Sequence, residues 1–307
     1  MGKLASISIT PEIESYAQGA AQDSVAPVAD FIAPTVEVPS ASCKYKIYSS
    51  KNRFRLPQTL RGMGGRAATI EFDRTDGSVD CEPHALDAPL DYAEIAEMRP
   101  EDVSGVSDEV AEIGALVHEK DVIDKAVAAA GAGTTLALGS SDTPIDAMDQ
   151  VIMALIKAAM YGSAMGIRVI FGADFWRQLK NNTNIRGHFV VGNAKAGGIQ
   201  LPTVESFGQL LIGNPQVKTS FMVYDDAAEG IAADIKFLLD KSALFFACKD
   251  SPTRRDPSFM KTFRLRNQWM VPRVYDRDDG RVKVFGYDWS CKVQVTNSAA
   301  VTRLNVA

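Results

Sequence analysis

Side chains that could bind a metal ion or act as nucleophiles are few and widely spaced in this sequence. The three histidines are His84, His118 and His188. None has a second histidine at ligand spacing, and we expect His118 to face solvent or a partner molecule. The four cysteines are Cys43, Cys81, Cys248 and Cys291. They form no C-x-x-C pair, so we predict packed, reduced thiols and neither a zinc site nor a disulfide framework.

The glycine-rich and acidic motifs do not match the sequence patterns of nucleotide-binding, nucleophilic or calcium-binding sites. GMGGR (62–66) and GAGTT (131–135) do not follow a strand and open a helix as a dinucleotide fingerprint must, so we interpret both as turns. GSAMG (162–166) places its serine wrongly for a nucleophile elbow. DRDDG (276–280) starts like a calcium loop but lacks the later glutamate, which favours a hairpin turn. We therefore predict a structural protein, not an enzyme, with no cofactor and no metal.

Composition sets the broad class of the protein. The chain has 307 residues, of which 46% are hydrophobic and 23% charged, so it can bury a sizeable core and is long enough for about two domains. A net charge of -5 argues against a surface that grips nucleic acid. The first residues lack the layout of a signal peptide and no run of 18 apolar residues occurs, so we expect a cytosolic protein with no membrane partner.

Two adjacent blocks of opposite charge are candidates for contact between copies of the chain. Between Val38 and Ile70 the sequence has no acidic residue and seven basic ones. The basic residues are Lys44, Lys46, Lys51, Arg53, Arg55, Arg61 and Arg66. The segment from Glu71 to Glu112 has fourteen acidic residues and two arginines. Its candidate contact residues are Glu94, Glu97, Glu109 and Glu112. The blocks are either solvated faces or the two sides of an inter-subunit contact, and their adjacency favours the contact.

The first eighty residues indicate extended structure. Residues 1–40 resemble an arm that cannot form a core alone, and FIAPTVEVP (31–39) alternates like an edge strand interrupted by prolines. KYKIYSS (44–50) and AATIEF (67–72) are expected to pair, with the glycine-rich turn LRGMGGR (60–66) between them. We therefore predict a long two-stranded flap over 43–80.

Helices and strands alternate in the middle of the chain. The longest predicted helix covers 108–130, with acidic residues at its start and Gly131 at its end. A second helix begins at Thr143-Pro144, followed by a buried strand over 168–172 and a helix over 174–181. A helix over 202–212 and a strand over 218–225 complete a predicted α/β domain.

The C-terminal part changes to long alternating runs, with Asp279-Gly280 as a hairpin turn. These antiparallel strands need a helix to cover one face, and the helix over 108–130 is the free candidate. We therefore predict a discontinuous domain from 83–135 and 260–307, with 136–259 inserted between its two parts.

The predicted order of elements resembles the Hong Kong 97-like fold of major capsid proteins from tailed double-stranded DNA phages. The phrases that carry the resemblance are VADFIAPTVEVP, CKYKIY, FRLPQTLRGMGGRA, AL-x-x-PLDYAE (85–94) and RDPSFMKTFRLRN. The resemblance implies an α+β fold. Its implied parts are an N-terminal arm (1–42), an extended β-hairpin loop (43–82), a peripheral domain with a spine helix (83–135 and 260–307) and an axial domain (136–259).

The resemblance also implies a function. The chain would assemble with itself into hexamers and pentamers that form an icosahedral shell around phage DNA, without binding a specific sequence. It would be built in the bacterial cytoplasm and end in the virion, with a separate scaffolding protein, a portal protein and scope for a decoration protein. Two alternatives stay open: an encapsulin-like shell that encloses a cargo enzyme, and an α/β enzyme that uses the 143–248 domain.

Overall fold

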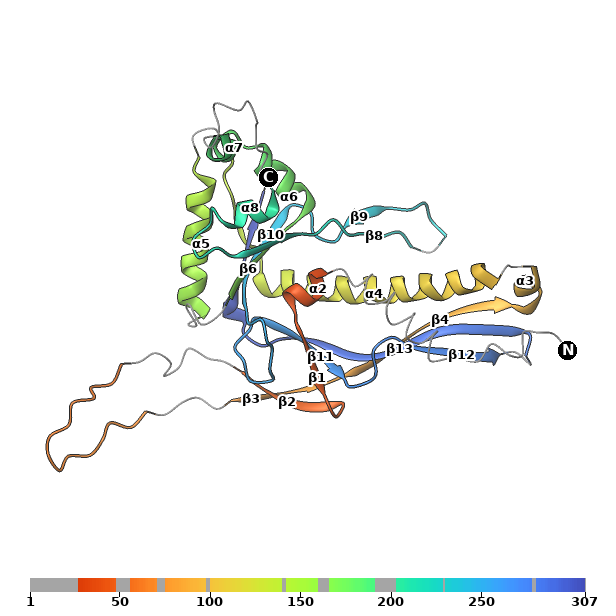
Figure 1. Ribbon diagram of the computed structural model, residues 1–307, viewed down its shortest axis with the longest axis horizontal. Coiled ribbons are helices and arrows are strands. Elements are labelled where there is room, and N and C mark those ends of the chain that lie inside the picture. Colours follow the sequence, from red (N-terminus) through yellow and green to blue (C-terminus); the bar gives the residue numbers. More distant parts are fainter. Residues whose placement is uncertain are drawn as a thin grey trace. The chain divides into compact units, whose positions relative to one another are not determined.

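The computed structural model describes residues 27–47, 56–70, 75–97, 100–139, 142–159, 166–190, 203–228, 230–277 and 280–306 (Figure 1). Contacts divide the chain into two compact units. The first unit consists of Met1–Cys43, Val79–Lys125 and Lys261–Gln294. The second unit consists of Lys44–Ser78, Ala126–Met260 and Val295–Ala307. Both units are therefore assembled from segments that lie far apart in the sequence.

A five-stranded sheet forms the frame of the first unit. Its order is β1 (Thr35–Val38), β11 (Met260–Leu265), β13 (Val282–Val295) and β12 (Val271–Arg277), and β4 (Glu82–Asp91) also pairs with β13. The predicted hairpin joins β12 to β13, and Gly280 at its turn has a φ of 78°, a conformation that glycine adopts without strain. The predicted strand over 31–39 is confirmed as the edge strand β1, although Phe31 and Ile32 belong to the preceding short helix α2 (Pro27–Ile32).

A long helix, α4 (Pro100–Ala130), supplies the apolar partner of this sheet. The predicted helix over 108–130 is confirmed and begins earlier, because a proline is well suited to the first helical position. Val110 and Ala111 of α4 pack with Met270, Tyr287 and Trp289 of the sheet side. Gly131, with a φ of 69°, donates its backbone N–H to the carbonyl of Val127 and ends the helix as predicted. The short helix α3 (Tyr92–Glu97) precedes α4.

The second unit contains its own five-stranded sheet. The order is β5 (Thr134–Thr135), β14 (Val301–Asn305), β10 (Ser242–Cys248), β6 (Gly166–Phe171) and β7 (Gln216–Thr219). The central strand β10 is antiparallel to both β14 and β6, whereas β7 runs parallel to β6. Every residue of β10 is buried, which is expected of a strand covered on both faces.

Helices α5 (Pro144–Ala159) and α6 (Ala173–Asn181) fill the core of the second unit with α7 (Thr183–Val190) and α8 (Val204–Gly208). The start of α5 at Pro144 confirms the prediction, and its buried residues Met148, Ile152 and Leu155 follow helical spacing. An aromatic cluster surrounds Phe171, whose ring centroid lies 5.3 Å from that of Phe175 and 5.7 Å from that of Trp176. Among the described helices, none combines the length and hydropathy that crossing a bilayer requires.

The strand pairing predicted for the flap is wrong. Strand β2 (Ser42–Lys46) pairs with β3 (Asp76–Asp80) and not with 67–72. Residues 67–70 form no strand, and 71–72 lie outside the described residues. The observed pairing brings the buried ring of Tyr45 against Gly77, where a Cβ would lie 2.7 Å from the ring, so this position requires glycine.

The predicted strand over 218–225 is two strands. Strand β7 ends at Thr219, and the chain leaves the sheet at Ser220, which is buried and donates its N–H to the carbonyl of Phe171. The second part, β8 (Val223–Asp225), pairs with β9 (Ile235–Phe237) in a separate hairpin. The helix predicted over 202–212 is shorter in the structure, because α8 ends at Gly208. A Cβ at Gly208 would lie 2.7 Å from the carbonyl oxygen of Pro215, so the following chain packs closely against this position.

The last strand lies in a different sheet from the one predicted. We expected 260–307 to belong with 83–135, but β14 pairs with β10 in the second unit. Leu304 and Val306 are buried in the core of that unit, so hydrophobic burial accounts for the return of the chain to β10. The sheet of the second unit therefore includes a strand, β14, from outside the predicted inserted segment 136–259.

Candidate functional site

The predicted basic residues are found on two described segments. Lys44 and Lys46 belong to β2, where Lys44 is exposed and Lys46 half-buried. Arg61 and Arg66 are exposed on residues 56–70, a segment with neither helix nor strand. The predicted contact residues Lys51, Arg53 and Arg55 lie outside the described residues.

Residues 56–70, which we call the loop segment, also expose large apolar side chains. Leu56 is 95% exposed, Leu60 86% and Met63 108%. A turn forms the tip, where Gly65 donates its N–H to the carbonyl of Gly62 at 3.0 Å. Apolar side chains with almost no contact to their own chain gain nothing from the hydrophobic effect in an isolated subunit. The loop segment therefore has the properties of a surface that another molecule covers.

The predicted acidic contact residues are all exposed. Glu94 and Glu97 belong to α3, and Glu109 and Glu112 to α4. Ile113 and Val117 lie four and eight residues after Glu109 on the same side of α4. Each is 51% exposed. We call Glu109, Glu112, Ile113 and Val117 the α4 stripe. It combines negative charge with exposed apolar surface, whereas the loop segment combines positive charge with exposed apolar surface.

A buried histidine and glutamate on α4 were missed from the sequence. His118 is 5% exposed and lies edge-on to the ring of Trp269 at 5.2 Å, so the expectation that it faces solvent is wrong. Burial lowers the pKa of His118 to about 4. The neighbouring Glu119 is fully buried, and its Oε1 accepts the backbone N–H of Ala29 at 3.2 Å. Burial raises the pKa of Glu119 to about 7, and the Ala29 hydrogen bond opposes this shift.

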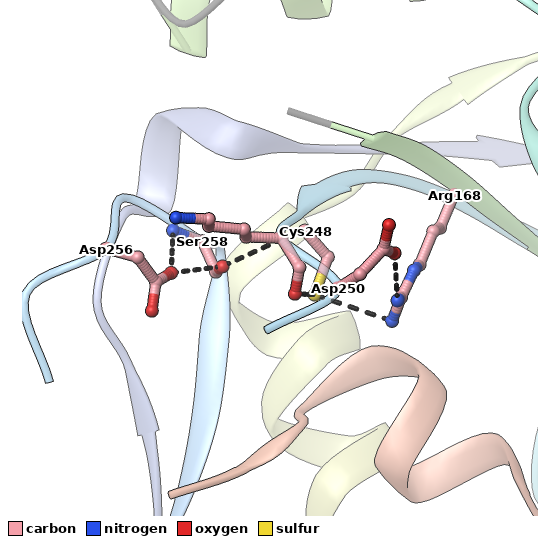
Figure 2. Close-up of polar contacts among 6 residues, drawn as sticks. Arg168, Cys248, Asp250, Asp256 and Ser258 are labelled. Atoms are coloured by element: carbon pink, nitrogen blue, oxygen red, sulfur yellow. Dashed lines mark hydrogen bonds and ion pairs between the residues drawn. The ribbon is translucent and has the colours of Figure 1, made fainter. Parts of the chain in front are cut away.

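A second buried polar group holds the connection from β10 to β11 (Figure 2). Arg168 of β6 donates to Oδ1 of Asp250 at 2.9 Å and to the sulfur of Cys248 at 3.5 Å. Burial raises the pKa of Cys248 to about 11, so its thiol stays protonated at neutral pH. The hydroxyl of Ser258 accepts the N–H of Lys249 at 3.0 Å and donates to Asp256. These contacts position backbone, and the sequence offers no motif that would have revealed them.

An open groove of about 860 Å³ lies in the second unit between the start of α5 and α7. Three carboxylates line it, but each has a structural hydrogen bond. Asp142 accepts the N–H of Gly139, Asp146 accepts from the side chain of Gln150, and Asp149 accepts the N–H of Ile212. His188 also lines the groove. These hydrogen bonds stabilise the start of α5 and its neighbours.

The four cysteines agree with the prediction of packed thiols, because all four are free and buried. In the part of the chain that the structure describes, no group of three or more His, Cys, Asp or Glu residues could hold a metal ion.

Comparison with known proteins defines the class of fold. No protein-family profile matches the chain. The major capsid protein of Pseudomonas phage JBD67 is 37% identical over 68 residues, and the match spans 22% of this chain and 22% of that relative. A phage-related protein from Bordetella bronchiseptica RB50 has a TM-score of 0.67 at 16% identity, with 96% of both chains covered.

Two further structures match at lower identity. A subunit of the mature capsid of bacteriophage PhiM1 has a TM-score of 0.54 at 12% identity, with 91% of this chain and 86% of that chain covered. The SrpI encapsulin complex of Synechococcus elongatus PCC 7942 has a TM-score of 0.51 at 9% identity, with 88% and 83% covered. The chain thus has the fold of phage capsid subunits, which confirms the mixed helix and sheet fold that the sequence resemblance implied.

Proposed function

We propose that this chain is the major capsid protein of a tailed phage, a structural subunit that assembles with itself into a closed shell around DNA. The loop segment carries the proposal. Its three most exposed apolar side chains, Leu56, Leu60 and Met63, have almost no contact with their own chain, and a phage capsid fold provides further copies to cover them. A virion capsid location follows from the same proposal.

Within this proposal the chain follows the Hong Kong 97-like plan. Residues 1–42 are the arm, 43–82 the extended loop, 83–135 the start of the peripheral domain and 136–259 the axial domain. The return segment 260–307 completes the peripheral domain, except for β14, which pairs with β10 of the second unit. The axial domains surround the axis of hexamers and pentamers, and the arm and loop reach over neighbouring copies.

The α4 stripe of a neighbouring copy is the proposed receptor for the base of the loop. Covering an almost fully exposed side chain such as Leu56 stabilises association by roughly 1.5–3 kcal/mol, and covering the half-exposed Ile113 or Val117 stabilises it by about half as much. An exposed ion pair contributes only about 0–1 kcal/mol. Apolar burial therefore supplies the affinity, and the opposite charges of the two blocks set the register and speed the encounter.

Other partners follow from this assembly. A separate scaffolding protein would guide curvature, and a portal protein would occupy one vertex, with scope for a decoration protein outside. The net charge of -5 suits a shell that encloses DNA without binding a specific sequence, because a polyanion can then slide during filling. A non-enzymatic role is consistent with buried polar side chains whose hydrogen bonds go to backbone groups.

An encapsulin-like compartment is the second candidate, because the SrpI encapsulin complex shares the fold at a TM-score of 0.51. Such a shell encloses a cargo protein in place of a genome. The contents of purified particles separate the two functions, since DNA supports the capsid and a single co-purifying enzyme supports the compartment.

Electron microscopy of the purified chain, alone and with the neighbouring genes expressed, is the direct test. We expect closed icosahedral shells or capsomer rings. Small discrete oligomers in both preparations would contradict the proposal and return attention to the groove between α5 and α7. Nuclease-protected DNA in particles from infected or induced cells would then distinguish a capsid from a cargo compartment.

A further inference from the structure

The β8–β9 hairpin has one apolar face that remains about half exposed among the described residues. In its register Val223 lies opposite Phe237, and Asp225 lies opposite Ile235. Directly opposed residues of an antiparallel pair point to the same face, so Val223, Phe237 and Ile235 share one face. They are 45%, 44% and 60% exposed, and Phe221 just before β8 is 60% exposed.

Polar contacts support the two strands of this hairpin. Lys236 on the opposite face forms ion pairs with Asp226 at 2.5 Å and with Asp234 at 2.9 Å. Oδ1 of Asp225 accepts the N–H groups of Ala227 and Asp234, at 2.9 and 2.8 Å. Two-stranded hairpins are marginally stable alone, so these contacts and a covering partner would act together.

The charge of the hairpin restricts what can cover it. Residues 221–238 contain four acidic residues and one lysine. Another hairpin, or the α4 stripe with Glu109 and Glu112, would bring acidic groups against acidic groups. The loop segment is the described surface that complements the hairpin in both respects, because it has exposed apolar side chains, Arg61 and Arg66, and no acidic residue.

The loop segment of the same copy does not cover the hairpin. In the part of the chain that the structure describes, Met63 and Leu60 are 108% and 86% exposed and Ile235 is 60% exposed. Contact between the two surfaces therefore requires a second copy. Fifteen extended residues span up to roughly 50 Å, so the base of the loop can lie on one surface while its tip lies on another.

We infer that the β8–β9 hairpin is a docking site for the tip of the loop segment from another copy of this chain. Leu60 and Met63 of the tip cover Val223, Ile235 and Phe237, and Arg61 and Arg66 lie near Asp225, which shares that face. The inference rests on the proposed shell function, and it adds a second receptor for the loop beyond the α4 stripe.

Cysteine pairing between copies tests this contact. Chains with Met63→Cys and chains with Ile235→Cys carry different tags and are assembled together, then oxidised with diamide. The four native cysteines are buried, so the introduced thiols are the reactive ones. Met153→Cys replaces Ile235→Cys in the control, because Met153 is an apolar residue of α5 that is 42% exposed.

We expect a mixed-tag disulfide dimer from the Met63 and Ile235 pair, at least tenfold more abundant than from the Met63 and Met153 pair. Equal yields in both pairs, or dimers only between two Ile235→Cys chains, would overturn the inference. Should the cysteine chains fail to form shells, hydrogen exchange of unmodified shells replaces the test. Amides of 221–238 must then exchange at least tenfold more slowly in shells than in free subunits, and equal exchange rejects the contact. Absence of shells from the unmodified chain would instead contradict the proposed function.

Discussion

Glu119 and Ala29 lie ninety positions apart in the sequence, yet Oε1 of Glu119 accepts the backbone N–H of Ala29 at 3.2 Å. This hydrogen bond fixes α2, whose residues Val28, Ala29 and Ile32 are buried, against α4. The second oxygen of Glu119 is buried and has no hydrogen-bond partner among the described residues. An ionised carboxylate is costly in such a place, which is why the pKa of Glu119 rises to about 7.

The adjacent His118 titrates in the opposite sense. Its pKa is lowered from 6.5 to about 4, whereas the pKa of Glu119 is raised from 4.5 to about 7. Between pH 4.5 and 6.5 the folded pair holds its one proton on Glu119, and the unfolded pair holds one on His118. The proton counts are equal, so the contributions of the two groups to the pH dependence of stability cancel in this range.

Glu119→Gln should expose the titration of His118. Glutamine keeps the acceptor for Ala29 but binds no proton, so the unfolded state then binds more protons than the folded state below pH 6.5. We expect the free energy of unfolding to rise by about 1–3 kcal/mol from pH 4.5 to 6.5. Urea denaturation of the unassembled subunit at several pH values measures this. Glu112→Gln, at an exposed position of the same helix, should keep the unmodified profile, and an unchanged profile for Glu119→Gln would refute the argument.

His118→Phe should produce the opposite slope. Phenylalanine keeps the edge-on contact with Trp269 and leaves Glu119 as the titrating group. Because the folded pKa of Glu119 is raised, its stabilising contribution is complete below pH 4.5 and is lost as the pH rises through about 7. The free energy of unfolding should therefore fall by about 1–3 kcal/mol over that range. His188→Phe, on the exposed side of α7, is the control that should not change the slope.

Gly172→Ala should destabilise the second unit severely. A Cβ at position 172 would lie 2.0 Å from the carbonyl oxygen of Asp240, a backbone atom that cannot rotate away. We expect a loss of about 3 kcal/mol or more in the free energy of unfolding, or an insoluble chain. Gly187→Ala in α7 is the matched control, because a Cβ there meets nothing within 4 Å. It should be neutral or stabilise by up to about 1 kcal/mol. Equal stability of both variants would contradict the close packing at Gly172.

Reversing the basic block should block or misdirect assembly without unfolding the subunit. The triple variant Arg53→Glu, Arg55→Glu and Arg61→Glu places like charges against the acidic residues of α3, α4 and the β8–β9 hairpin of a neighbouring copy. Sedimentation and electron microscopy should show at least a tenfold loss of shells, with an unchanged unfolding curve. Lysine at the same three positions keeps the charge and should retain assembly. Normal shells from the glutamate variant would remove charge pairing from the proposed mechanism.

The sequence alone determined the elements whose signal is local. The apolar spacing and Thr143-Pro144 start predicted α5, Gly131 marked the end of α4, and Asp279-Gly280 marked the turn between β12 and β13. The order of the predicted elements, together with the phrases quoted above, carried the resemblance to the capsid fold. The two charge blocks were also readable, because charge is a property of composition, whereas the contact that they suggest stays a prediction.

The tertiary structure alone decided which distant segments meet. Strand β2 pairs with β3, where Tyr45 lies against Gly77. Leu304 and Val306 of the C-terminal segment are buried in the core beside β10. Neither pairing has a local signal in the sequence. The burial of His118 and Glu119 likewise depends on α2, Trp269 and the sheet, which come from separate parts of the chain. Periodicity and turn residues act over one or two turns, whereas packing is decided by the volume and polarity of whatever residue arrives from elsewhere.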